Sequence, residues 1–305
     1  MKQSLRWLIL GGTLFFLATA VKQHWQEVAA IRIDILGWVI LIIATGVTLL
    51  AHTWAGWVWT WVLKELNQSV NTPEFIQVYL KTNIAKYVPG NIWHHYGRIV
   101  AARNANISIG IATISVLIEP LLMAAAALIL VILLGNNLTH LNNSILTRIL
   151  QITGLIVILG VIHPRFFNPI ISWLQSWKSR KSVNQNIETV SLGRYPLIPL
   201  VGELAFILLR SIGFILTFTA LTPIKISDIP ILLGAFSFSW LLGFIVPGAP
   251  GGLGVFEATA IALLQNHFSA GIIISATGLY RLVSILSESL GASVAWLDAR
   301  LFSTN

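Results

Sequence analysis

Long apolar runs separated by short polar segments dominate the chain. A helix that crosses a bilayer needs about 20 mostly apolar residues. We expect six spanning helices, at Leu5–Val21, Ile35–Leu63, Ile111–Leu134, Ile145–Ile162, Leu197–Leu221 and Ala270–Leu297. The pattern therefore predicts an all-α integral membrane protein.

Two further apolar regions, residues 74–105 and 229–266, are broken near the middle by proline and glycine. Each arm is short for a full span, so we predict a re-entrant helical hairpin in each region. Irregular backbone is not tolerated against lipid, so both breaks should be buried in protein or line a wet cavity. The alternative is that each region is a pair of kinked spanning helices. The break residues are Pro89, Gly90, Pro247, Gly248, Pro250, Gly251, Gly252 and Gly254.

The order of segments is repeated along the chain. Each half runs span, span, broken hairpin, span, and 25 residues separate the end of the preceding span from the break in both halves. Three spans per half would invert the second half in the membrane, which is typical of transporters. We therefore predict two inverted repeats, residues 1–144 and 145–305, with a polar cytoplasmic linker near 176–194. The alternative is chance similarity between apolar helices.

Composition supports the membrane class. The chain has 19 Lys and Arg against 11 Asp and Glu, only 10% charged residues and 56% apolar ones. Mean hydropathy is +0.80. These values exclude a disordered chain, a coiled coil and an ordinary soluble enzyme. Cysteine is absent, which excludes disulfides and thiolate metal sites.

Charge placement predicts the orientation. Lys2 and Arg6 precede the first span and the linker is strongly basic, whereas residues 135–144 hold no Lys or Arg. The positive-inside rule then places both termini in the cytoplasm, in a plasma (inner) membrane. The +8 net charge is accordingly attributed to cytoplasmic loops and anionic lipid, with no nucleic-acid partner. Ala18-Thr19-Ala20 resembles a signal-peptidase site, but we expect a retained first helix.

The first break could form part of an anion site. The helix after Pro89 would begin with unpaired backbone N–H groups and a positive dipole end, which attract phosphate or carboxylate. Asn91, His95 and Arg98 share one helical face there, and Lys86 precedes the break. If the hairpins enter from opposite faces, their tips would meet around one polar cavity. The alternative is that these small residues serve only tight packing.

Ionisable residues inside apolar spans are usually paired or functional. Two sets of ion pairs are possible from the sequence. The same-helix pairs are Glu203–Arg210 and Arg281–Glu288, and the cross-half pairs are Arg98–Glu257 and Glu119–Arg281. We favour a structural salt bridge for Glu203–Arg210, and a cavity-lining or gating role for Glu257 and Arg281. The head-group or cavity candidates are Lys86, Asn91, His95, Arg98, Glu119, Glu257 and Arg281. No catalytic, metal-binding or cofactor motif occurs, so no catalytic residue, metal or cofactor is expected.

The two break motifs resemble the signatures of a known family. The similarity is to the lysylphosphatidylglycerol synthase transmembrane (flippase-like) family. The first motif is Lys86-Tyr87-Val88-Pro89-Gly90-Asn91, and the second runs from Val246 to Glu257 with the sequence VPGAPGGLGVFE. The resemblance covers nearly the whole chain. It implies an inner-membrane protein with two repeats and re-entrant helices, and a role in moving lipids between leaflets. The motif positions are Pro89, Gly90, Pro247, Gly251, Gly252 and Glu257.

The best-understood members of that family carry a soluble aminoacyl-transferase domain after the membrane part. This sequence ends at Asn305, so we expect a stand-alone member that does not itself make lysyl-lipid. The expected function is a lipid flippase or transporter that binds an anionic or polyprenyl-linked head group between the two broken helices. Two alternatives remain: the membrane subunit of a lipid-modifying or glycosyl-transfer system with a soluble transferase partner, and a non-transporting scaffold.

Overall fold

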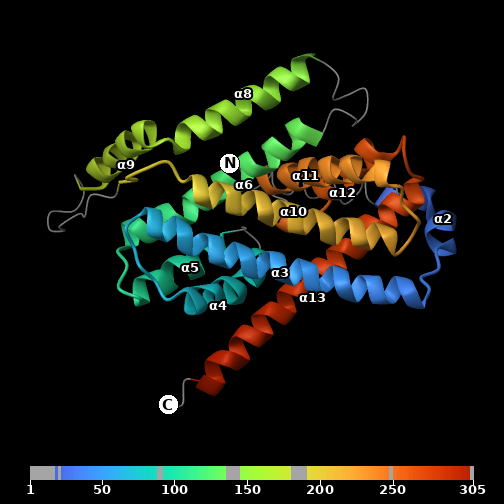
Figure 1. Ribbon diagram of the computed structural model, residues 1–305, viewed down its shortest axis with the longest axis horizontal. Coiled ribbons are helices and arrows are strands. Elements are labelled where there is room, and N and C mark those ends of the chain that lie inside the picture. The colour runs from blue at the N-terminus through green and yellow to red at the C-terminus, as the bar shows by residue number, and fades with distance from the viewer. Residues whose placement is uncertain are drawn as a thin grey trace.

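The computed structural model describes residues 18–19, 22–87, 92–134, 145–179, 191–246 and 250–302, and every regular element in these ranges is helical. Figure 1 shows long helices packed side by side, with α13 crossing the others. The α-helices are α2 (Trp25–Ala30), α3 (Ile35–Glu65), α4 (Thr72–Asn83), α5 (Trp93–Asn104), α6 (Ile109–Leu134), α8 (Ile145–Ile162), α9 (Pro164–Ser179), α10 (Leu197–Thr219), α11 (Ile229–Ile245), α12 (Val255–Leu264) and α13 (Ala270–Phe302). The 3-10 turns are η1 (Ile84–Tyr87), η3 (Ile226–Asp228) and η4 (Pro250–Gly252).

Five of the predicted spans are confirmed as long apolar helices: α3, α6, α8, α10 and α13. The described residues hold six helices that are long and apolar enough to cross a membrane. The predicted all-α membrane class is therefore confirmed. The first predicted span, Leu5–Val21, lies almost wholly outside the described residues.

The sixth candidate span is not one of those predicted. It is the first arm of the second hairpin, Ile226–Ile245, where η3 runs directly into α11 to give 20 residues. The expectation that this arm is too short was wrong, because the helix starts three residues earlier and Pro230, in the first turn of α11, interrupts no hydrogen bond. In contrast, α4 and α5 have 12 residues each and α12 has 10. At about 1.5 Å per residue these three are too short to span. That the hairpins are re-entrant stays a prediction, as does the inverted repeat.

The two hairpins approach α13 from its two ends. Gln77 of α4 donates a hydrogen bond to Asp298, near the C-terminal end of α13. The second hairpin ends at Leu264, shortly before α13 begins at Ala270. The breaks of the two hairpins contact each other through η1 and η4. A Cβ atom on Gly251 would lie only 2.9 Å from Cε1 of Tyr87, so the tips meet in van der Waals contact.

A tightly packed helix pair supports these tips. Helices α3 and α10 lie against each other, and a Cβ at Gly202 would come within 2.6 Å of Val58. Small residues allow such close approach between membrane helices. Arg194, just before α10, forms an ion pair with Glu65 at the end of α3 (2.7 Å), so these two helix ends lie together.

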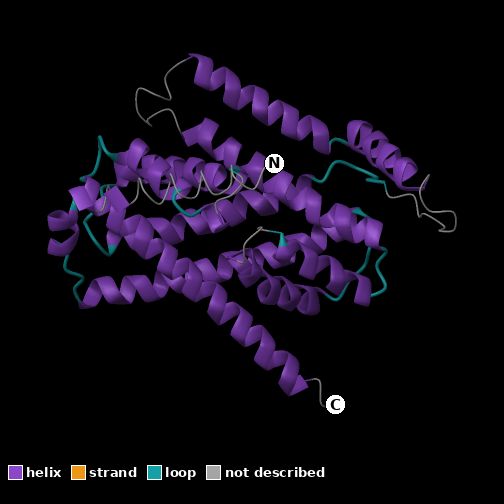
Figure 2. Cartoon of the chain, turned by 180° about the vertical axis from the view of Figure 1, so that it is seen from behind, coloured by secondary structure: helices purple, strands orange, loops and turns teal. Residues whose placement is uncertain are grey.

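Helix α8 differs from the other long helices. Only 11% of its most apolar window is buried, compared with 67% for α6. Figures 1 and 2 show α8 and α9 along one outer side of the bundle. Exposed apolar side chains on such a helix are the surface expected to face lipid tails. The cavity described next lies instead among the buried helices.

Candidate head-group cavity between the two helix breaks

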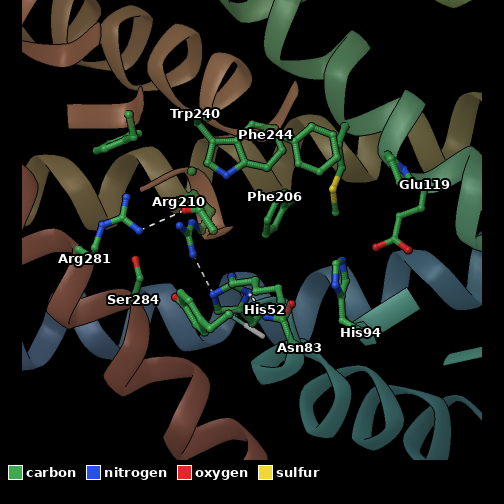
Figure 3. A pocket seen from close by; sticks show the side chains of 18 of the residues that line it. His52, Asn83, His94, Glu119, Phe206, Arg210, Trp240, Phe244, Arg281 and Ser284 are labelled. Carbon is green, nitrogen blue, oxygen red and sulfur yellow. Dashed lines mark hydrogen bonds between the residues drawn. The ribbon is translucent and has the colours of Figure 1, made fainter. Parts of the chain in front are cut away.

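A cavity of about 150 Å³ lies where the two breaks meet. Its lining combines both halves of the chain, with Glu119 and His94 at one end and Arg281 and Ser284 at the other (Figure 3). Trp240 and Phe244 of α11 stack with ring centroids 5.1 Å apart and form one wall. The cationic and imidazole side chains that line the cavity are His52, Lys86, His94, His95, Arg98, Arg210 and Arg281.

The first ion pair joins α5 to α6. Arg98 Nη1 lies 2.9 Å from Oε2 and 3.1 Å from Oε1 of Glu119, and the two residues are 2% and 1% exposed. The guanidinium carbon of Arg98 also lies 3.6 Å from the centre of the Tyr79 ring, a cation–π contact. Buried charges are stable in a protein only when they are paired in this way.

The second ion pair stabilises the glycine-rich break. Arg281 Nε lies 2.6 Å from Glu257 Oε1, and Arg281 Nη1 donates to the carbonyl of Gly251 (3.1 Å). Glu257 also accepts a hydrogen bond from the N–H of Gly254 (2.7 Å), which caps the start of α12. Gly251, Gly252 and Gly254 have φ of 57°, 73° and 81°. Only glycine adopts this left-handed backbone without strain, which explains the PGGLG pattern.

A third cluster connects the halves around one carboxylate. Glu288 of α13 lies 2.6 Å from Lys86 of the first break, 3.0 Å from His52 and 3.8 Å from Arg210. Arg210 Nη1 is also 2.8 Å from His52 Nε2, and Asn83 Nδ2 is 3.2 Å from His52 Nδ1. Lys86 and Arg210 therefore share a single carboxylate.

The charges at the cavity do not balance. In the part of the chain that the structure describes, four cations (Lys86, Arg98, Arg210, Arg281) face three paired carboxylates (Glu119, Glu257, Glu288). Several buried nitrogen atoms here have no hydrogen-bond partner among the described residues: Nδ1 of His94 and His95, and Nε of Arg98 and Arg210. The Nε–H groups of Arg98 and Arg210 are buried donors without partners, which is costly, so this lining is suited to accept an anion.

The structure brings most of the predicted site residues together. Lys86, His95, Arg98, Glu119 and Arg281 line one cavity, as do Gly251 and Gly252 of the break. Glu257 contacts Arg281 without lining the cavity, Pro250 begins η4, and Gly254 precedes α12. The predictions for Pro89, Gly90, Asn91, Pro247 and Gly248 lie outside the described residues.

None of the four pairings considered from the sequence is among the ion pairs of the described residues. Arg98 pairs with Glu119, Arg281 with Glu257, and Glu288 with Lys86, whereas Glu203 has no partner there. The structural salt bridge expected for Glu203–Arg210 was therefore wrong. Seven residues along a helix separate two charges by about 10 Å, and neighbouring helices offer nearer partners.

Several lining residues were missed from the sequence. His52 lies within an apolar span, so the rule that intramembrane ionisable residues are functional could have included it. Glu288 was considered only as a partner of Arg281; it contacts Lys86, His52 and Arg210 without lining the cavity itself. Arg210 was considered only as a structural partner. Tyr79, Asn83 and Trp240 carry no sequence signal, because aromatic and amide residues are common in such segments.

Comparison with known proteins supports the membrane class and adds the family. A model of the family described as "Lysylphosphatidylglycerol synthase TM region" matches residues 4–290. Among curated proteins, no sequence matches the chain. The family match and the six apolar helices make this a multi-pass membrane protein related to lipid modification or transport. The chain belongs to the family of the lysylphosphatidylglycerol synthase transmembrane region.

Proposed function

We propose that the protein binds the phosphate-bearing head group of an anionic lipid in the cavity and moves that lipid between the two leaflets. The observation that carries the proposal is the surplus of cations at the cavity, together with its unpaired donor nitrogens. Lys86 and Arg210 share Glu288, so the surplus positive charge lies between these two side chains. A negatively charged oxygen there would gain charge-assisted hydrogen bonds.

The size of the cavity favours a small anionic group. Its volume is about 150 Å³. An engineered protein cavity of about this volume holds one benzene molecule, which is six heavy atoms. A phosphate group has five, so it fits, whereas an extended glycan would not. The acyl or prenyl tails would stay in the bilayer while the phosphate occupies the cavity. Phospholipids and polyprenyl phosphates share this chemistry.

The two breaks supply a route for alternating access. Their tips meet at Gly251 and Tyr87, and they reach the meeting point from opposite ends of α13. Separation of one tip from the cavity would open it toward one side while the other tip keeps it closed. Such motion around a central site formed by broken helices is the general mode of secondary transporters. No covalent step is required.

Mass spectrometry of the lipids that co-purify in mild detergent tests this proposal. Wild type should be enriched in one phosphate-bearing anionic lipid relative to the source membrane, and the lipid mass distinguishes a phospholipid from a polyprenyl phosphate. The variant Lys86→Gln/Arg210→Gln should lose the enrichment by about tenfold or more, because each lost charge-assisted hydrogen bond contributes about 1.5–3 kcal/mol. Arg194→Gln is the matched control, because the side chain of Arg194 is 68% exposed and pairs away from the cavity.

One outcome would contradict the proposal. An unselective lipid mixture that is identical in wild type and the double variant would contradict a head-group site and favour a scaffold. Because the double variant leaves Glu288 with fewer partners, its monodispersity must first match that of wild type. Lys86→Gln alone, which retains the contacts of Glu288 with His52 and Arg210, provides a milder variant with the same expected direction.

A further inference from the structure

Glu203 of α10 is a fully buried carboxyl group close to the cavity. Its exposed fraction is 0%, and neither carboxyl oxygen has a hydrogen-bond partner among the described residues. It follows Gly202, which packs tightly against Val58 of α3, so water has little access from that side. An apolar side chain would pack at this position at a lower free-energy cost than a buried carboxyl group without partners.

The charged groups around Glu203 are already engaged. Helix α10 packs against α3, α6, α11 and α13, and α11 carries no ionisable residue. The ionisable groups at the cavity from these elements, from α10 itself and from α5 are His52, His94, His95, Arg98, Glu119, Arg210, Tyr280, Arg281 and Glu288. Arg98 is paired with Glu119. Arg210 contacts His52 and Glu288 instead.

An ionised carboxylate buried without a cation is so unfavourable that the group binds a proton instead. We propose that Glu203 is a proton-binding site whose occupancy is coupled to binding of the lipid phosphate, so that transport is linked to a proton. The inference rests on the proposed function and adds its energy source. The proton adds to the Glu203 carboxylate without any other bond changing.

Charge balance explains the coupling. While Glu203 is protonated, four cations face three carboxylates, and one negative charge on a phosphodiester completes the balance. If Glu203 loses its proton, four carboxylates already balance the four cations. Glu203 and Arg210 are seven residues apart on one helix, or about 10 Å. At that distance an extra negative charge weakens anion binding about tenfold in a protein-like dielectric.

The direction of the pH effect follows from this balance. Affinity for the phosphate is highest at low pH, where Glu203 holds its proton, and falls as pH rises until the proton is lost. Conversely, a bound phosphate favours proton uptake at Glu203. A lipid that enters with a proton on one side of the membrane and leaves with it on the other side would be driven by the proton gradient.

Infrared spectroscopy of the detergent-purified protein tests the proton site without any ligand. Wild type at about pH 7 should show a carbonyl band of a buried protonated carboxyl group. The band should be missing in Glu203→Gln, and in Glu203→Met if the glutamine variant does not fold. Glu65→Gln, which removes a carboxylate paired with Arg194, is the matched control and should keep the band. Absence of the band from wild type would overturn the inference.

Isothermal titration with short-chain phosphatidylglycerol tests the coupling. The single phosphodiester charge of this probe does not change between about pH 5 and about pH 9, so any pH dependence belongs to the protein. Titrations in two buffers of different ionisation enthalpy give the number of protons taken up. At a pH where the ligand-free protein has lost the Glu203 proton, wild type should take up protons on binding, and its Kd there should be about tenfold higher than where Glu203 is protonated. Glu203→Gln should lose that rise and bind as wild type does at low pH.

The outcomes separate this inference from the proposed function. Binding by Glu203→Gln with the same pH dependence and proton uptake as wild type would overturn the proton role of Glu203 and leave the lipid site intact. No binding of the probe by wild type at any pH would contradict the proposed function, and the inference with it. Glu65→Gln should reproduce the wild-type pH dependence, and a loss of the dependence there would also count against Glu203.

Discussion

At the residue scale, the buried ion pairs define the cavity. Charged residues inside apolar segments could be identified from the sequence, because few classes of residue are so costly in a membrane. Their partners could not, since Arg98–Glu119 and Arg281–Glu257 form between helices whose relative rotation the sequence pattern leaves undetermined. The capping bond from Gly254 to Glu257 also depends on a backbone turn that residue types alone do not determine.

Breaking the Arg98–Glu119 pair should destabilise the protein strongly. Arg98→Met leaves Glu119 buried without its partner, and we expect a loss of about 3–5 kcal/mol. The double variant Arg98→Met/Glu119→Leu should recover most of this loss, because no isolated charge remains. Denaturation in detergent, followed by tryptophan fluorescence, measures both values. Equal losses in the single and double variants would mean that the pair does not act as a unit.

At the element scale, the two helix breaks position the site. Proline and glycine predicted an interruption in each region, and separate helices lie on either side of residues 88–91 and 247–249, which are themselves outside the described residues. Helices α4, α5 and α12 are too short to span, in line with the expectation that these arms are short. Helix α11 is longer, because η3 and α11 form one continuous element. Hydropathy does not reveal such continuity, since Lys225 and Asp228 make the start of this segment look like a polar loop.

Substitution at the second break should alter the contact between the tips. Gly251→Ala places a Cβ at 2.9 Å from Tyr87 and at a φ of 57°, so we expect a loss of about 1–2 kcal/mol together with weaker lipid binding. Gly278→Ala in α13 is the matched control, because no atom outside its own helix lies within 4 Å of the new Cβ. The control should be neutral or stabilising by up to about 1 kcal/mol. Thermal stability and lipid content of both purified variants provide the comparison.

At the scale of the whole molecule, the arrangement of the hairpins around α13 matters most. Their approach from opposite ends agrees with a repeat that reverses direction, but the inverted repeat, the boundary near residue 144 and the cytoplasmic termini stay predictions. Hydropathy predicted five of the spans, because it reflects the bilayer itself, whereas the orientation inferred from loop charge stays a prediction. The meeting of η1 with η4 depends on contacts between distant segments, which no local pattern contains.

Cysteine labelling tests the predicted sidedness, since the chain has no native cysteine. Asn104 and Gln265 are exposed residues at the ends of the two hairpins. We expect Asn104→Cys to react with an impermeant maleimide only from the cytoplasmic side, and Gln265→Cys only from the outer side. Ser191→Cys, in the predicted cytoplasmic linker, should behave as Asn104→Cys does. Labelling of Asn104→Cys and Gln265→Cys from the same side would exclude hairpins that enter from opposite faces.

Lipid exchange between leaflets tests the central claim most directly. The purified protein is reconstituted into vesicles with fluorescent phosphatidylglycerol or phosphatidylcholine, and a membrane-impermeant quencher reports the outer-leaflet fraction over time. The account predicts that wild type accelerates exchange of the anionic lipid over the zwitterionic one, and that Lys86→Gln/Arg210→Gln does not. Equal rates for both lipids, or no acceleration over protein-free vesicles, would contradict it.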